Sequence, residues 1–191
     1  MAPRRLAESR SIYLGPWRID ITNRPGVPRL VTLAVLARTV RSALESVPAP
    51  SPASIGLILA DDPELAGLNA THMGKHGPTD VLSFPLLPAE TYPPHPGGPS
   101  RAKGKARGGI DFALPPGRRI HLGDIVVSVE RAIDQAGAGR GGQTGDVRWS
   151  ATDELRLLVT HGTLHVCGWD HAEPAEEAAM RALEQRLLRG A

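Results

Sequence analysis

Three histidines fall within eleven residues of this chain, in the segment HGTLHVCGWDH, at His161, His165 and His171. On a helix, residues four apart lie on one face with Cβ atoms about 5 to 6 Å apart, so His161 and His165 can direct both rings at one ion. Gly168 lets the chain turn past the helix end, which returns His171 to the same point. Three neutral imidazoles leave the fourth position of a zinc ion to water, whose pKa then falls to about 7. The spacing predicts one catalytic Zn²⁺ ion, although imidazoles also suit nickel, copper or iron, and three unrelated histidines are the alternative.

The same spacing occurs in zinc proteases whose motif begins H-E-x-x-H, where the glutamate is the general base. In this chain Gly162 occupies the position of that glutamate. Glycine cannot activate a water molecule for peptide hydrolysis, so a zinc metalloprotease is a less favoured interpretation.

The composition is that of an ordinary globular protein. Its 191 residues carry 22 basic and 20 acidic side chains, a formal charge of 22 − 20 = +2, with 41% hydrophobic residues. The single cysteine, Cys167, excludes an intramolecular disulfide and zinc sites built from several cysteines. No run approaches the ~20 apolar residues of a membrane span. We therefore expect a cytoplasmic protein with no membrane segment.

Strand and helix patterns alternate along the chain and would position the histidines. The expected strands are residues 17–22, 54–60, 81–86 and 121–129, and the expected helices are residues 33–47, 62–69, 129–138, 152–168 and one that begins at residue 174. We expect Glu154 to cap or start the long helix rather than to act in catalysis. These elements predict an α/β (α+β) fold: one compact domain with a small mixed sheet packed with helices, and the metal site at the end of the long helix. We place it at residues 17–190, after an N-terminal extension of residues 1–16.

Residues 87–119 form the one segment whose composition departs from this pattern. They hold 7 prolines and 6 glycines, and six basic against two acidic residues, so we expect a Pro/Gly-rich basic loop insertion. Its alternating residues Arg101, Lys103, Lys105 and Arg107 are candidates for non-specific contacts with RNA phosphates, and a solvated loop without function is an equal alternative.

Three separated blocks carry a family resemblance. They are Leu68-Asn69 with the segment PTDVLSFP at residues 78–85, the segment LGDIVVS at residues 122–128, and Glu154 followed by HGTLHVCGWDH, Met180 and Glu184. In these blocks the chain resembles the YbeY family of bacterial metal-dependent endoribonucleases, also called rRNA maturation factors. The resemblance implies a single-strand-specific RNA hydrolase that acts in rRNA maturation and ribosome quality control, with zinc held by the three histidines. The implied partners are single-stranded RNA, rRNA in particular, and small-subunit ribosomal proteins.

The blocks also contain candidate residues beside the metal. Asp170 and Asp124 are candidates for support of catalysis, with a turn or strand-end role as an equal alternative for each. The candidate substrate-binding residues are Lys75, Thr79, Asp80 and Ser83, although hydrogen bonds to the backbone are the favoured role of Thr79 and Ser83. The expected mechanism is attack by metal-bound water or hydroxide on a phosphodiester, or polarisation of the phosphate by the metal while a ribose hydroxyl attacks.

One position departs from the family pattern. Met73 stands where the family usually has an arginine, a residue suited to clamping a phosphate. Methionine cannot supply that charge. A second function therefore stays open: a metal-binding ribosome-assembly factor with weak or no catalysis.

Overall fold

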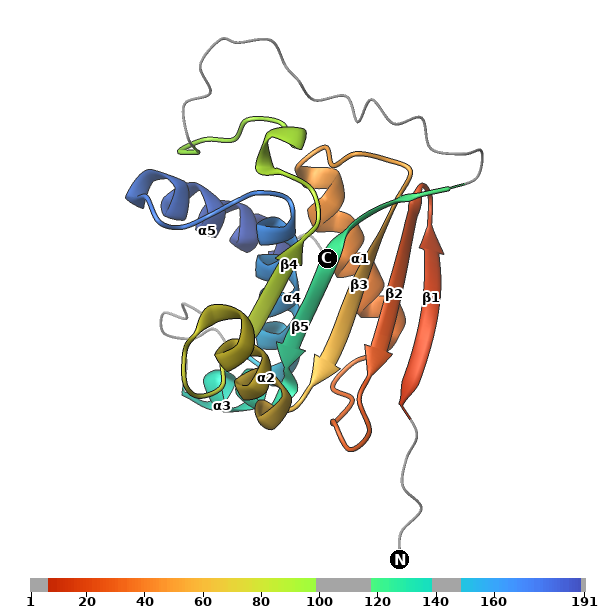
Figure 1. Ribbon diagram of the computed structural model, residues 1–191, viewed down its shortest axis with the longest axis vertical. Helices are drawn as coiled ribbons and strands as arrows, with labels where there is room; N and C mark the ends of the chain where they lie inside the picture. The colour runs from red at the N-terminus through yellow and green to blue at the C-terminus, as the bar shows by residue number, and fades with distance from the viewer. Residues whose placement is uncertain (1–6, 99–117, 139–148, 190–191) are drawn as a thin grey trace, which may run out of the picture.

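A five-stranded mixed sheet is the centre of the computed structural model, which describes residues 7–98, 118–138 and 149–189. The strands are β1 (Glu8–Leu14), β2 (Trp17–Asn23), β3 (Ala53–Ala60), β4 (Val81–Pro85) and β5 (Ile120–Ser128). Their order across the sheet is β1-β2-β3-β5-β4, with β2, β3 and β5 parallel and both edge strands antiparallel to their neighbours (Figure 1). The α/β class, the single domain and the mixed sheet agree with the sequence prediction.

The first strand corrects the expected domain boundary. β1 lies inside residues 1–16, which we expected to be an extension, and it pairs with β2 along its whole length from Glu8↔Asn23 to Leu14↔Trp17. Gly15, with a φ of +62°, allows the tight turn between the two strands. Ile12 and Leu14 pack against the main core, so this part of the chain is integral to the sheet.

One face of the sheet is covered by α1 (Leu33–Ser46), α4 (Ala151–Val166) and α5 (Pro174–Arg189). Figure 1 shows α1 and α4 behind the sheet. Alternate residues of the central strands point to these helices and form the main core, as expected for the period of two in a strand. Its fully buried side chains include Ile19, Ile55, Leu57, Ile125, Leu36 and Leu164.

The long helix α4 begins with a capping box rather than at Glu154. The Ser150 hydroxyl accepts the backbone N–H of Asp153, and the Asp153 carboxylate accepts the backbone N–H of Ser150. Glu154 lies in the first turn of the helix, but the capping side chains are Ser150 and Asp153. The Glu154 side chain is buried and accepts a hydrogen bond from Trp149 Nε1.

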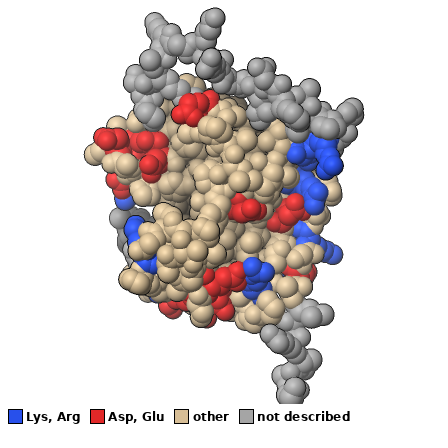
Figure 2. Space-filling model, viewed as in Figure 1, with Lys and Arg blue, Asp and Glu red and all other residues tan. Residues whose placement is uncertain are grey.

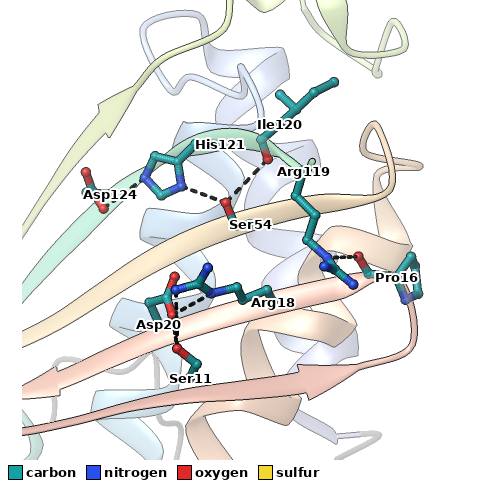
Figure 3. Close-up of polar contacts among 9 residues, drawn as sticks. All are labelled: Ser11, Pro16, Arg18, Asp20, Ser54, Arg119, Ile120, His121 and Asp124. Atoms are coloured by element: carbon teal, nitrogen blue, oxygen red, sulfur yellow. Dashed lines mark hydrogen bonds and ion pairs between the residues drawn. The ribbon is translucent and has the colours of Figure 1, made fainter. Parts of the chain in front are cut away.

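The opposite face of the sheet is only partly covered. Helix α2 (Asp62–Leu68) and the π-helical turn η1 (Asn69–Met73) lie over a small apolar cluster made of Ala60, Leu65, Leu82 and Val126. Beyond that cluster the face carries polar side chains, and we call these residues the open face: Ser11, Arg18, Asp20, Ser54, His121 and Asp124 (Figure 3). Figure 2 shows that acidic and basic side chains of the described residues are interspersed on this side of the molecule.

The remaining elements connect these layers. Helix α3 (Val129–Gly137) follows β5 directly, and Ser128 caps it by accepting the backbone N–H of Arg131. A short 3₁₀ turn, η2 (Ala89–Thr91), begins the expected basic loop. The candidate phosphate-binding residues of that loop, Arg101 to Arg107, lie outside the described residues. None of the helices in the described parts of the chain is long and apolar enough to cross a membrane.

Candidate metal centre

Helix α4 places His161 and His165 one turn apart with their rings facing each other. Their Nε2 atoms are 3.0 Å apart and their ring centroids are 4.5 Å apart. Zinc–nitrogen bonds of about 2.0 to 2.1 Å in a tetrahedral site would place two ligand atoms about 3.4 Å apart. The pair predicted from the i, i+4 spacing is therefore close to the separation that one ion requires.

The loop after α4 returns the third histidine to this pair. Gly168 adopts a φ of +82° and turns the chain, so that the His171 ring lies 5.6 Å from the His161 ring and 5.0 Å from the His165 ring. One ligand atom from each histidine lies within 4.8 Å of the other two. The structure thus brings together all three residues that the sequence analysis selected.

A buried carboxylate orients the first of these rings. His161 Nδ1 donates a hydrogen bond of 2.7 Å to Glu184 Oε1 on α5. With the proton held on Nδ1, the Nε2 atom of neutral His161 keeps a lone pair directed at His165. Glu184 belongs to a sequence block that carried the family resemblance, but its role in orienting a ligand was not predicted, because no local spacing links residues 161 and 184.

The electrostatics of the cluster favour a neutral imidazole at His165. Burial lowers the pKa of His165 to about 4, with further lowering by the neighbouring His161 and His171. A neutral ring is the form that ligates a metal. Cys167 is the nearby alternative ligand, but burial raises its pKa to about 12, so it remains a thiol. Three convergent imidazole nitrogens fit a borderline cation such as zinc.

A cavity of about 390 Å³ lies beside the histidines. His161 and His171 are part of its lining, together with Met180, Leu157, Leu158, Gln135, Arg181 and the carboxylates of Asp80, Glu154, Glu177 and Glu184. Asp80 is held in place because its Oδ2 accepts from Gln135 Nε2 at 3.0 Å and its Oδ1 accepts the Val81 backbone N–H at 2.9 Å. Among the candidate residues of the PTDVLSFP block, Asp80 is therefore the one that lines this cavity.

The other candidate substrate-binding residues have different positions. The Ser83 hydroxyl donates to the Gly162 carbonyl at 3.0 Å, which ties β4 to α4 between the two helical histidines. Thr79 donates to the Asp80 carboxylate. Lys75 is exposed in the turn after η1, and Met73 is 55% exposed at the end of η1. Within the described chain, neither Lys75 nor Met73 lines the cavity.

Asp124 lies on the opposite side of the sheet from the three imidazoles, whereas the charge of Asp170 acts on His165 and opposes the lowering of the His165 pKa. Ile125 and Ser83 face α4, so their strand neighbours Asp124 and Phe84 face the opposite side of the sheet. Asp124 accepts instead from His121 Nε2 at 3.2 Å on the open face (Figure 3). Asp170 Oδ1 accepts the backbone N–H of His171 at 2.7 Å, which is the turn-forming role among the two expected alternatives.

Comparisons with known proteins agree with this geometry. Residues 23–191 match a model of the family described as Endoribonuclease YbeY. A relative named Endoribonuclease YbeY from Salinispora tropica is 42% identical over 171 residues, which cover 89% of this chain and 93% of that protein. Relatives of the same name from Thermobifida fusca and Roseiflexus sp. are 38% and 33% identical over 90% of this chain and cover 92% and 91% of their own lengths. The fold is similar to the solution structure of TM1509 from Thermotoga maritima, with a TM-score of 0.50 and 19% identity over 91% of this chain and 87% of that chain.

Proposed function

Because the chain belongs to the YbeY endoribonuclease family, we propose that it is a zinc-dependent, single-strand-specific endoribonuclease. The observation that carries this proposal is the convergence of three histidine nitrogens within 4.8 Å, beside a cavity that is open to substrate. The proposed substrate is rRNA, in maturation and ribosome quality control. Small-subunit ribosomal proteins are the proposed partners and the cytoplasm is the proposed location.

The residues around the site would have different roles in such an enzyme. His161, His165 and His171 would hold the ion. When bound, the ion would lower the pKa of a water molecule and offset the negative charge of a phosphate. Glu184 keeps the His161 Nε2 atom free of a proton by accepting from Nδ1. Four carboxylates line the cavity against the single guanidinium of Arg181, so a phosphate is repelled from its interior. The scissile phosphate therefore binds at the rim that the histidines form.

The packing of Gly162 argues against the metalloprotease alternative. A Cβ atom on Gly162 would lie 2.6 Å from Ile125 Cγ2 and 3.0 Å from Val81 Cγ2. Helix α4 therefore packs against β4 and β5 too closely for the glutamate that acts as general base in H-E-x-x-H enzymes. The close contact between the helix and the sheet leaves no space for a glutamate at position 162.

Loss of a metal ligand tests the proposal directly. His161→Ala is expected to abolish both bound zinc and the cleavage of single-stranded RNA, while His121→Ala on the open face retains both. Zinc content by elemental analysis and cleavage of matched single-stranded and duplex RNA are measured on the same preparations. Unchanged cleavage by His161→Ala after metal loss would rule out the proposed mechanism.

The exposed Met73 favours one second candidate, a metal-binding ribosome-assembly factor with weak or no catalysis. Its side chain offers no charge to a phosphate where the family usually has an arginine. Wild type and Met73→Arg are compared on single-stranded RNA with zinc loading measured in parallel. Inert wild type with cleavage restored by the substitution supports the binding factor, whereas cleavage by wild type supports the nuclease.

A further inference from the structure

The three candidate ligands differ in how they are held. His161 and His165 are fixed by helix α4, whereas His171 is exposed in the loop between α4 and α5. A ligand on a loop reaches a defined position only if the loop itself is held in place. The contacts of this loop therefore decide how well the third nitrogen is positioned.

Glu176, in the first turn of α5, is a buried acceptor that fixes this loop. Its Oε1 atom accepts the backbone N–H of Asp170 at 2.8 Å. The same oxygen accepts a hydrogen bond of 2.6 Å from His95 Nε2, and the side chains of His95 and Glu176 are only 8% and 4% exposed. Asp170 in turn accepts the backbone N–H of His171 at 2.7 Å. A chain of hydrogen bonds thus runs from His95 through Glu176 and Asp170 to the third ligand.

His95 also contacts the loop through its ring. The imidazole stacks on the indole of Trp169, with centroids 4.1 Å apart and an angle of 15° between the planes. Trp169 is two residues before His171 and is itself buried. The ring contact and the hydrogen bond together hold two consecutive residues of the loop, Trp169 and Asp170.

The backbone around His95 lies tightly against the same region. A Cβ atom on Gly97 would come within 2.3 Å of the Glu176 backbone nitrogen, and one on Gly168 would lie 3.0 Å from the Ala89 side chain. Residues 89–97 therefore pack across the loop and the start of α5, with room for nothing larger than glycine at two contacts. This segment is 72 or more residues before Trp169 in the sequence, so its contacts with the loop are tertiary contacts.

We propose that His95 is a positioning residue for the metal centre, which holds the loop of His171 through Glu176 and Trp169. The proposal rests on the proposed zinc site. Loss of the His95 donor leaves the buried Glu176 carboxylate with an unmet hydrogen bond, and the carboxylate must then move toward water or gain a proton. Either change weakens its hold on Asp170 and releases His171.

Two substitutions separate the hydrogen bond from the ring contact. His95→Phe keeps an aromatic ring against Trp169 but removes the donor to Glu176. His95→Gln keeps a donor, because its Nε2 atom can take the place of the imidazole Nε2, but removes the ring. His121→Phe is the matched control, since His121 also pairs with a carboxylate but on the open face.

Zinc affinity of the metal-free proteins is measured by competition with a chromophoric chelator, and the visible spectrum of the Co²⁺-loaded proteins reports ligand geometry. We expect about tenfold weaker zinc binding by His95→Phe, as for other residues that orient metal ligands, together with an altered cobalt spectrum. His95→Gln should recover most of the affinity, and His121→Phe should match wild type. A purely structural role would lower the thermal stability of the metal-free protein without changing the cobalt spectrum of the folded fraction.

The outcomes distinguish this inference from the proposed function. Wild type that binds no zinc overturns the metal site itself. Wild type that binds zinc, with His95→Phe folded and equal to it in affinity and spectrum, overturns the positioning role alone. If His95→Phe does not fold, Glu176→Gln decides, because it weakens the acceptor of the same hydrogen bonds: zinc binding about tenfold weaker than wild type supports the hydrogen-bond chain, and affinity equal to wild type contradicts it.

Discussion

The two faces of the sheet each carry a histidine beside a carboxylate, but only one of these pairs is prepared for a metal. His161 and Glu184 are 27% and 9% exposed and lie 2.7 Å apart, whereas His121 and Asp124 are 37% and 46% exposed and lie 3.2 Å apart. His121 uses both ring nitrogens, because Nδ1 accepts from Ser54 Oγ at 3.0 Å and Nε2 donates to Asp124 (Figure 3). His161 donates through Nδ1 to Glu184, and its Nε2 faces the Nε2 atom of His165 at 3.0 Å, so its second nitrogen meets another imidazole that can share an ion with it.

This difference shows that residue type alone does not define a site. The open face has a serine, a histidine and an aspartate in hydrogen-bonding contact, yet no second imidazole faces His121 among the described contacts and its carboxylate partner is solvated. On the helical face, three imidazoles converge, and burial lowers the pKa of His165 so that this ring stays neutral. The convergence of several imidazole nitrogens is what distinguishes the candidate metal centre from an ordinary polar network.

The largest expected effect is the loss of one of the convergent nitrogens. His165→Ala should weaken zinc binding by more than about a hundredfold, since loss of an outer partner alone costs about 10- to 100-fold. His121→Ala should leave the zinc affinity unchanged. Isothermal titration of the metal-free proteins measures both, and an equal loss in the two variants would remove the distinction between the faces.

A smaller loss of zinc affinity is expected when the carboxylate of Glu184 is replaced, and none when that of Asp124 is replaced. Glu184→Gln should weaken zinc binding about 10- to 100-fold, because the amide no longer holds the proton of His161 Nδ1 as firmly. Asp124→Asn should have no effect on zinc binding, because Asp124 lies on the other side of the sheet. Chelator competition on both variants checks this, and a matching loss with Asp124→Asn would contradict the placement of that residue.

Gly162 on the helical side and Gly56 on the open face allow the packing of the two sides of the sheet to be compared. Gly162→Ala would place a methyl group 2.6 Å from the buried Ile125, so we expect a loss of about 1 to 3 kcal/mol in the free energy of unfolding. Gly56→Ala would place its methyl group within reach of only the Asp124 carboxylate, a half-exposed group that can rotate away, and should cost less than about 0.5 kcal/mol. Urea denaturation of the metal-free proteins measures both values. Equal losses would show that the open face is as tightly packed as the helical face.

The smallest expected effect is a pH dependence of the metal-free protein. Burial lowers the pKa of folded His165 to about 4 from 6.5, so the unfolded chain binds more protons between these values. The free energy of unfolding therefore falls as the pH drops from about 6.5 to about 4, by about 1 to 2 kcal/mol after allowance for partial exposure of the ring. Denaturation of wild type and His165→Gln at pH 7 and pH 4.5 tests this. The same pH dependence in both proteins would assign it to other groups.

The helical half of the site could be predicted from the sequence because its geometry is local. The four-residue spacing of His161 and His165 and the turn at Gly168 define directions that depend only on helix geometry and a left-handed glycine. The side of the sheet on which Asp124 lies could not be predicted in this way. Alternation in β5 shows that Asp124 and Ile125 face opposite sides, but only the tertiary packing of α4 shows which side carries the histidines.

The contacts that were missed all join distant parts of the chain. Glu184 and His161 are 23 residues apart, and Glu176 and His95 are 81 residues apart. The edge strand β1 was missed because its polar residues hide a pattern in which only Ile12 and Leu14 pack against the core. Residues 8–14 form a strand because they pair with β2. A short polar sequence gives no alternating hydrophobic pattern from which this pairing could be predicted.

The coordination of the loaded protein tests the central claim most directly. Zinc K-edge X-ray absorption on the wild-type protein should show four nitrogen or oxygen donors at about 2.0 to 2.1 Å, with scattering from the outer ring atoms of three imidazoles and no sulfur. This result corresponds to His161, His165 and His171 around one ion with a solvent molecule in the fourth position. A sulfur neighbour at about 2.3 Å, or a fourth protein ligand in place of solvent, would contradict the account.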